Sequence, residues 1–241
     1  MGEEKGAEGR GLLLVLLSLS YLLAYFDRTL MIVVGETIKA EFQLSDKQLS
    51  LLTGASFVLI YGICGVISGS LLDRWSRKKV LVWALIFWSV ATALCGTARN
   101  FAQLAIARAG VGIGEAPNMP AGLSMIGDLY PPAKRPMASA LFFAGSTLGV
   151  LAAFLLGSWM AASWGWRTAF LAAAPPGILL ALVIALVTRE PERERRLVRG
   201  EGADGLFGTL RLIGRNKPMV WLLISSGFAG YANVGLLQWL P

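Results

Sequence analysis

The sequence predicts an all-α membrane protein, and three observations support that prediction. The chain has 241 residues, of which 55% are hydrophobic, and its mean hydropathy is +0.61, well above the usage of soluble globular domains. Seven apolar stretches are each close to the ~20 residues that a helix needs to cross a bilayer. Basic residues gather at the ends of these stretches, as membrane topology signals do. The pI near 9.7 therefore indicates topology rather than binding to nucleic acid.

The stretches divide the chain into a short N-terminus, a bundle of six spans, a charged linker and a seventh span. Ser45 and Asp46 are expected to cap the second span, and Pro175 and Pro176 to kink the sixth. The N-terminus covers residues 1–11, the bundle 12–188, the linker 189–217 and the last part 218–241. Within these parts, the spans are expected at about residues 12–34, 47–72, 80–98, 101–129, 136–162, 168–188 and 218–240.

The distribution of Lys and Arg sets the predicted orientation. One set of loops carries only Lys39, Lys47, Arg99 and Arg167, and the opposite set carries most of the positive charge. The N-terminus and the richer loops are therefore expected in the cytoplasm, in a multi-pass protein of the cell (inner) membrane. The richer set comprises Lys5, Arg10, Arg74, Arg77, Lys78, Lys79, Lys134, Arg135, Arg189, Arg193, Arg195, Arg196, Arg199, Arg211, Arg215 and Lys217.

The fourth stretch carries charges where a membrane helix rarely has them. Arg108 and Glu115 are seven residues apart, so on a helix they lie about two turns apart on one face. Charges at membrane depth are costly and usually face a partner or a wet cavity. Pro117 and Pro120 remove backbone donors and are expected to kink the helix, while Gly110, Gly112 and Gly114 allow close approach of neighbours. The pattern favours the wall of a binding site over a purely structural ion pair.

The depth of the charged residues places them near one another. Asp27 lies about 22 Å above the expected start of the first span, and Arg108 about 10 Å below the outer end of the fourth. In a hydrocarbon core of about 30 Å these depths are similar. Asp27, Arg28 and Arg108 would therefore meet if the two spans are neighbours, with Glu115 about 10 Å deeper.

A loop motif resembles that of a known family. Residues 69–81 read GSLLDRWSRKKVL, which resembles the G-x-L-A-D-R-x-G-R-K-x-x-L signature of the major facilitator superfamily. Leu72 and Ser76 depart from the small residue and the glycine of that signature. A simple positive loop would not need Asp73, an aspartate that in the family helps to hold the cytoplasmic side closed. The resemblance implies a gating motif of Gly69, Asp73, Arg74, Arg77 and Lys78.

A finer resemblance is to spinster-like transporters, and related organic-anion symporters share parts of it. The family fold has twelve spans in two six-helix bundles, the first built from a 3+3 inverted repeat. We therefore expect the N-terminal bundle plus a seventh helix, truncated from twelve. The resemblance rests on Tyr25-Phe26-Asp27-Arg28, on Arg108 with Gly112–Pro117, on Trp166-Arg167 with Phe170, and on Arg189-Glu190-Pro191.

The resemblance implies a secondary active transporter that works by alternating access. Its substrate would be an amphiphilic or anionic small molecule, such as a lysolipid or a sphingoid phosphate, and its other partners protons and the lipid bilayer, with the protein a monomer. Arg28 and Arg108 would hold the anionic group, and Asp27 and Glu115 would exchange protons as they lose or gain an arginine partner. Histidine is absent, so any proton relay must use carboxylates. Possible cavity-lining residues are Tyr25, Asn118, Tyr231 and Asn233.

Several alternatives remain at this point. A symporter of protons and a small organic anion such as a sugar acid would need a compact polar cavity, whereas a lipid transporter would need an apolar one open to the bilayer. A non-transporting fragment or scaffold is the other alternative. Val150 stands where the family's antiporter signature has proline, which weakens an exchange mechanism, and Gly145 and Gly149 are expected to pack helices. The two cysteines, Cys64 and Cys95, lie in apolar stretches, and no metal, cofactor or nucleophile–base pattern indicates an enzyme.

Overall fold

The computed structural model describes residues 2–188, 190, 214–222, 224–226 and 228. The chain divides into two units, Met1–Glu194 and Arg195–Pro241, and each is described by itself. In the second unit, the described residues are helical at 214–215, 217–222, 224–226 and 228, where the seventh span was predicted to begin. The charged site residues of the predicted bundle all belong to the first unit.

The described part of the first unit consists of α-helices interrupted by two π-helical turns, as the predicted all-α class requires. The π-helical turns are Leu51–Ala55, which leads into α4, and Ala153–Gly157, which joins α8 to α9. The helices are α1 (Gly2–Val33), α2 (Gly35–Phe42), α3 (Asp46–Ser50), α4 (Ser56–Arg74), α5 (Arg77–Thr97), α6 (Phe101–Glu115), α7 (Asn118–Leu129), α8 (Arg135–Ala152), α9 (Ser158–Trp164) and α10 (Trp166–Val187).

Five helical segments of the described chain are long and apolar enough to cross a membrane. They are Gly9–Val33, Asp46–Arg74, Arg77–Thr97, Arg135–Trp164 and Trp166–Val187. They match the predicted first, second, third, fifth and sixth spans, and α10 runs through both of its prolines as one helix.

The predicted fourth span is not one helix but two. Ala116 and Pro117 separate the end of α6 from the start of α7, although both keep right-handed helical dihedral angles. Pro117 has no backbone N–H to donate, and its ring disfavours continuation of the preceding turn. Asn100 caps the start of α6 by accepting a hydrogen bond from the backbone N–H of Gln103 at 3.0 Å. The interruption lies at the first of the two prolines for which a kink was predicted.

Local sequence signals fix the other helix ends. Ser45 caps α3 in a capping box with Gln48, which confirms the predicted cap of the second span. Ser76 caps α5 and accepts a hydrogen bond from the backbone N–H of Lys79 at 3.2 Å. Between α9 and α10 the chain turns at Gly165, whose φ of +83° lies in a region that side chains rarely adopt.

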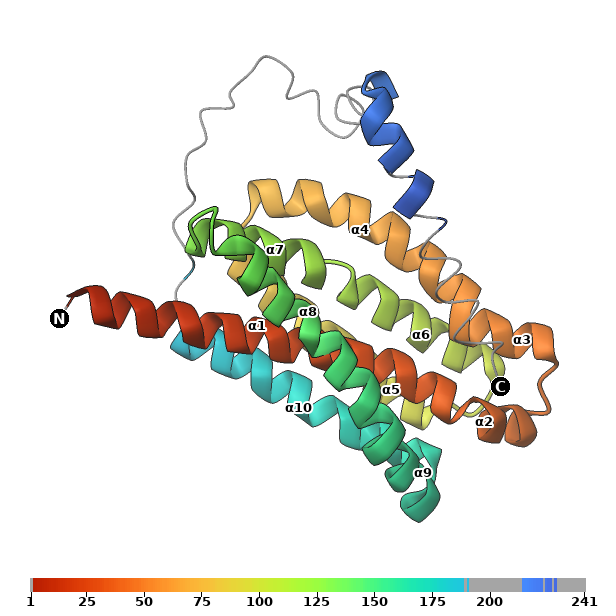
Figure 1. Cartoon of the computed structure of the whole chain (residues 1–241). Helices are drawn as coiled ribbons and strands as arrows, with labels where there is room; N and C mark the ends of the chain where they lie inside the picture. Colours follow the sequence, from red (N-terminus) through yellow and green to blue (C-terminus); the bar gives the residue numbers. More distant parts are fainter. Residues whose placement is uncertain (1, 189, 191–213, 223, 227, 229–241) are drawn as a thin grey trace. The chain divides into compact units, whose positions relative to one another are not determined.

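The helices pack in an order that places α1 and α6 around a shared interior. α1 packs against α8 and α10, α5 packs against α10 and α6, and α4 packs against α6 (Figure 1). At Gly145 and Gly149, a β-carbon would collide with the backbone of Ser18 and Leu22, so α8 and α1 touch almost backbone to backbone. The predicted packing role of these two glycines is confirmed.

The core consists of two clusters of buried side chains, one at each end of the bundle. One lies toward the end where α4 passes to α5, here called the Arg77 end, and includes Leu81, Trp88 and Phe142. The other lies toward the end where α1 passes to α2, here called the Glu41 end, and includes Leu30, Val111 and Phe170. In sequence, Asp27 and Arg28 fall between Phe26 and Leu30, and Arg108 falls between Ala107 and Val111, all four of which belong to the second cluster.

Candidate functional site

The four predicted charged residues come from two helices and are all withdrawn from the surface. Asp27 and Arg28 lie on α1, and Arg108 and Glu115 on α6. The exposed fractions of Asp27, Arg108 and Glu115 are 3%, 2% and 0%, and the side chain of Arg28 is 22% exposed. Side chains of these types are almost never fully buried unless they are paired, so their partners define the site.

Arg28 and Glu115 form an ion pair across the interior. The Nε atom of Arg28 donates to Oε2 of Glu115 at 2.6 Å. The arginine also lies over three aromatic rings, with its Cζ atom 4.3 Å from the ring centre of Tyr61 and 5.1 Å from those of Tyr25 and Phe57. Such contacts contribute about 0.5–2 kcal/mol each, depending on desolvation. The guanidinium of Arg28 thus contacts one carboxylate and three aromatic rings.

Asp27 has a partner that the sequence analysis did not anticipate. Its Oδ2 accepts a hydrogen bond from Oγ1 of Thr92 on α5 at 3.0 Å. The charges of Glu115, Arg108 and Arg28 also act on this carboxylate. Among the four predicted residues, the side-chain hydrogen bonds are the one that Arg28 donates to Glu115 and the one that Asp27 accepts from Thr92.

Arg108 is a buried cation with unused hydrogen-bonding capacity. Its Cζ atom lies 4.9 Å from the ring centre of Phe57. Its Nε has no hydrogen-bond partner among the described residues, and neither has Oε1 of Glu115. Leaving a buried charged group unsatisfied costs more than the ~1–3 kcal/mol of a neutral one. The site therefore has one donor and one acceptor available for an anion, a proton or water.

The glycines of α6 bring its charges into the bundle. A β-carbon at Gly114 would lie 2.7 Å from Cβ of Trp88, and one at Gly110 would lie 3.2 Å from Cβ of Ala91. Because α6 approaches α5 this closely, Glu115 is enclosed rather than exposed at the helix surface. The predicted function of these glycines in close helix approach is confirmed.

The possible cavity-lining residues have different surroundings. Asn118 is buried and tied to α1, because Ser20 Oγ donates to its Oδ1 at 2.8 Å and its Nδ2 donates to the carbonyl of Ser20 at 3.2 Å. Tyr25 lies beside Arg28 and accepts a hydrogen bond from Tyr21 Oη at 3.4 Å. Tyr231 and Asn233 lie outside the described residues.

The predicted gating motif lies at the Arg77 end, where Arg77 and Lys78 both contact neighbouring helices. Arg77 is buried, forms an ion pair with Asp128 and donates to Oγ of Ser124 at 3.1 Å. Lys78 donates from Nζ to the carbonyl oxygens of Ala185, at 2.8 Å, and of Thr188. The motif thus fastens the start of α5 to α7 and to the end of α10. Gly69 and Arg74 lie in the last turns of α4, and Asp73 is exposed there.

Glu190 also belongs to this network, although the sequence analysis named it only as part of the resemblance to spinster-like transporters. It accepts a hydrogen bond from the backbone N–H of Arg77 at 2.7 Å and another from the hydroxyl of Ser76. A carboxylate at a helix N-terminus interacts favourably with the helix dipole. Glu190 therefore links the chain after α10 to the start of α5.

A second polar cluster lies at the Glu41 end. Nε1 of Trp166 donates to Oε2 of Glu41 at 2.7 Å, and Arg167 donates to its Oε1 at 2.5 Å. Arg167 also donates to the carbonyl oxygen of Ala98 at 3.1 Å. These hydrogen bonds, that of the indole first, lower the pKa of Glu41 below its ordinary value. The cluster joins α2, α10 and the end of α5.

The Cys, Asp and Glu residues of the described part of the chain are not grouped as metal ligands. No group of three or more Cys, Asp or Glu residues there is placed to hold a metal ion. Both cysteines are free, with Cys95 buried and Cys64 partly buried.

The chain thus has a bundle with charged residues inside it, an interrupted fourth span and a basic motif at one end. Residues 17–241 match the Major Facilitator Superfamily, and the chain belongs to that family. It is 30% identical over 239 residues to a protein named as a probable L-galactonate transporter of Escherichia coli (strain K12), an alignment that covers 95% of this chain and 52% of the relative. It is 33% identical over 222 residues to an MFS-type efflux pump of Mycolicibacterium smegmatis, covering 91% of this chain and 51% of the pump.

A solved structure supports the finer resemblance. The chain superimposes with a TM-score of 0.78, at 34% identity, on the crystal structure of a bacterial homolog to the human lysosomal transporter Spinster in an inward-facing and unoccupied conformation. The match covers 94% of this chain and 53% of that one. The predicted family, its spinster-like character and the all-α membrane fold are therefore confirmed. The chain spans about half the length of the relatives it matches.

Proposed function

We propose that this bundle belongs to a proton-coupled secondary transporter that moves an anionic or amphiphilic small molecule by alternating access. The observation that supports the proposal best is the buried Arg28–Glu115 ion pair at 2.6 Å beside Arg108, whose Nε has no partner among the described residues. One carboxylate and two guanidinium groups in an enclosed interior can take up an anion and a proton together without a change in net charge.

The coupling step follows from competition for Arg28. An anionic substrate that binds both Arg108 and Arg28 draws the guanidinium of Arg28 away from Glu115. A buried carboxylate that loses its cation takes up a proton more readily, so Glu115 would then be protonated. By linkage, protonation of Glu115 would in turn favour binding of the anion. Asp27, held by Thr92, is the second carboxylate that this scheme assigns to proton exchange.

The surroundings of Arg28 bear on the kind of anion. The rings of Tyr25, Phe57 and Tyr61 place apolar surface directly beside the cation. A molecule with an anionic head and an apolar body, such as a lysophospholipid or a sphingoid phosphate, could use both. The name of the Escherichia coli relative supports the alternative of a small sugar acid, and the proposed coupling applies to either.

The bilayer arrangement is part of the same proposal. The bundle corresponds to residues 12–188, the charged residues 189–217 to a linker and residues 218–241 to a further helix. The bias of Lys and Arg supports an N-terminus in the cytoplasm, and the proposal takes the protein to be a monomer in the cell membrane. The Arg77 end would then be the cytoplasmic end, where Arg77 and Asp128 hold helices together.

Binding of candidate anions to the full-length protein tests the proposal. Lysophosphatidate and L-galactonate are titrated against wild type and Arg108→Ala, with Arg10→Ala as a control that removes an exposed arginine outside the site. Loss of a charged hydrogen bond of about 1.5–3 kcal/mol predicts that Arg108→Ala binds the anion about tenfold more weakly or worse. Equal affinity of all three proteins for both anions would contradict the proposal, and binding of L-galactonate alone would favour the small-anion alternative.

A further inference from the structure

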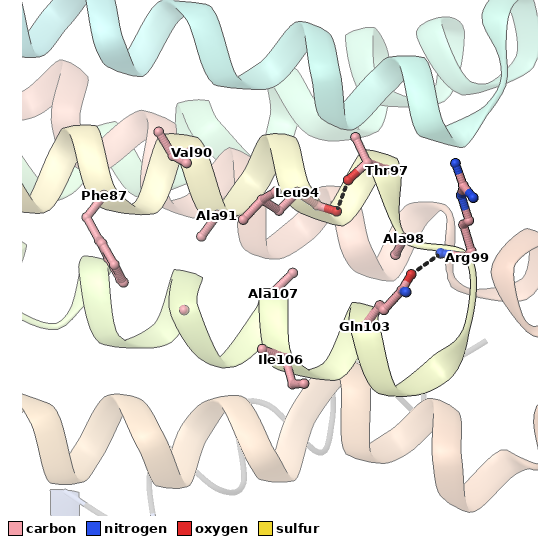
Figure 2. A pocket seen from close by; sticks show the side chains of 11 residues that line it. Phe87, Val90, Ala91, Leu94, Thr97, Ala98, Arg99, Gln103, Ile106 and Ala107 are labelled. Carbon is pink, nitrogen blue, oxygen red and sulfur yellow. Dashed lines mark hydrogen bonds between the residues drawn. The ribbon is translucent and has the colours of Figure 1, made fainter.

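An apolar groove runs along the outside of the bundle between α5 and α6, away from the buried charged residues. Its first half encloses about 670 Å³ and lies beside the connection between the two helices. Figure 2 shows Leu94 of α5 and Ala107 of α6 on the two sides of this half, with Arg99 and Gln103 at its end. The side chains of Leu94 and Ile106 are 54% and 72% exposed, so the groove opens outward.

A second pocket continues the groove toward the Arg77 end. It encloses about 420 Å³ and shares Phe87 with the first. Lys79, Trp83 and Phe87 line it from α5, together with Trp75 from the connection that follows α4. Since α5 has 21 residues, the groove follows a helix of about 30 Å, which is the thickness of the hydrocarbon core.

Polar side chains in the first half of the groove occur only at its end. Thr97 donates from Oγ1 to the carbonyl oxygen of Leu94 at 3.0 Å, and Oε1 of Gln103 accepts from the backbone N–H of Arg99 at 2.8 Å. Both are therefore satisfied within the protein. The guanidinium of Arg99 is exposed and has no hydrogen bond or ion pair with the described residues.

The second half repeats this arrangement at the opposite end of α5. The neighbouring Arg77 and Lys78 are engaged in the gating motif. Lys79 is exposed, and its ammonium group has no hydrogen bond or ion pair in the described part of the chain. Trp75 and Trp83 line the pocket beside it. Tryptophan is typical of the membrane interface, and a lysine there extends its ammonium group toward the lipid head groups.

We propose that this groove binds two anionic phospholipids of the bilayer, one from each leaflet. The phosphate of one lipid contacts Arg99 and that of the other contacts Lys79, and their acyl chains meet near Phe87. Guanidinium and ammonium groups both bind phosphate well, and the apolar path between them matches the chains in length. A cation at each end of an apolar groove of bilayer thickness is complementary to anionic lipid rather than to a neutral helix. The site is separate from the proposed transport site and does not depend on it.

Retention of lipid by the purified full chain tests the proposal. The chain is reconstituted in phosphatidylcholine nanodiscs that contain phosphatidylglycerol, and the lipid that remains bound is counted by native mass spectrometry. Wild type should retain two phosphatidylglycerol molecules, Lys79→Gln and Arg99→Gln one each, and the double variant none. Lys134→Gln and Lys47→Gln, which remove exposed lysines elsewhere at the two ends of the bundle, should behave as wild type.

Three outcomes would overturn the proposal. The first is equal retention of phosphatidylglycerol by all variants. The second is equal retention of phosphatidylcholine, which would show that the cations do not select the lipid. The third is a dimer that wild type forms and that Val90→Trp abolishes, since this would show that a second copy of the chain occupies the groove. Lys79 and Arg99 are exposed, so their substitution should leave the fold intact, and the thermal midpoint of each variant checks this.

Discussion

The ion pair between Arg28 and Glu115 predicts that removing one partner destabilises the fold more than removing both. Arg28→Met removes the cation and leaves the carboxylate of Glu115, which is 0% exposed, without its partner. Breaking a buried pair in this way costs about 3–5 kcal/mol. Because the side chain of Arg28 is 22% exposed, we expect the lower end of that range, about 3 kcal/mol. The double variant Arg28→Met/Glu115→Leu removes both charges and should lose less than about 1 kcal/mol.

A double-mutant cycle measures this difference. The unfolding free energies of wild type, both single variants and the double variant are compared in detergent, and the expected coupling energy is about 2–3 kcal/mol. The penalty of Arg28→Met should shrink in acid, because a protonated Glu115 carries no charge to leave unpaired. The exposed pair of Lys39 and Asp46, at 2.5 Å, is the control and should show no resolvable coupling. A coupling at Arg28 and Glu115 no larger than that of the control would refute the reasoning.

Two further predictions concern packing and pH. Gly114→Ala would place a β-carbon 2.7 Å from the side chain of Trp88 and should destabilise the bundle by about 1–3 kcal/mol. Gly65→Ala, whose β-carbon meets nothing within 4 Å, should stabilise α4 slightly. Equal thermal midpoints of the two variants would contradict this prediction. The hydrogen bond from Trp166, with that from Arg167, lowers the pKa of Glu41 below its ordinary 4.5. The stability that the Glu41 carboxylate contributes is therefore complete above pH 4.5, and it is lost as the pH falls through the lowered pKa of the folded protein. The difference in unfolding midpoint between wild type and Glu41→Gln should therefore vanish in acid, and a difference that stays constant there would be the contrary result.

The fold was predictable because its signals are local. Span length, hydropathy and the clustering of Lys and Arg depend on neighbouring residues, and the bilayer restricts each apolar stretch to a helix. The interruption of the fourth span at Pro117 was harder to predict, because the effect of a proline on a membrane helix depends on the partners that neighbouring helices supply to the freed backbone groups. At Pro175 and Pro176, by contrast, α10 continues as one helix.

The candidate site was predictable by residue but not by partner. Arg108 and Glu115 stood out because charge is rare in an apolar stretch. Thr92, which donates to Asp27, and Phe57, which lies under both arginines, carry no such signal, because threonine and phenylalanine are ordinary residues of membrane helices. Their contacts depend on the rotation of α4 and α5, which helix packing alone determines.

The ion pair of Arg77 shows the same limit at the end of the bundle. The motif that contains this arginine was evident, but its partner Asp128 lies 51 residues further along the chain. An aspartate near the end of a span is equally compatible with simple exposure to solvent. Only the approach of α7 to the start of α5 distinguishes the two possibilities.

The response of transport to a pH gradient tests the proposed coupling most directly. Full-length wild type, Glu115→Gln, Asp27→Asn and the control Glu36→Gln, which changes an exposed carboxylate outside the site, are reconstituted in proteoliposomes. Accumulation of the bound anion is then measured with and without an imposed gradient. The coupling predicts that the gradient drives accumulation by wild type and Glu36→Gln, and that this response is abolished in Glu115→Gln and Asp27→Asn. A full response in both of the latter variants would contradict it and would indicate a uniporter or a different coupling ion.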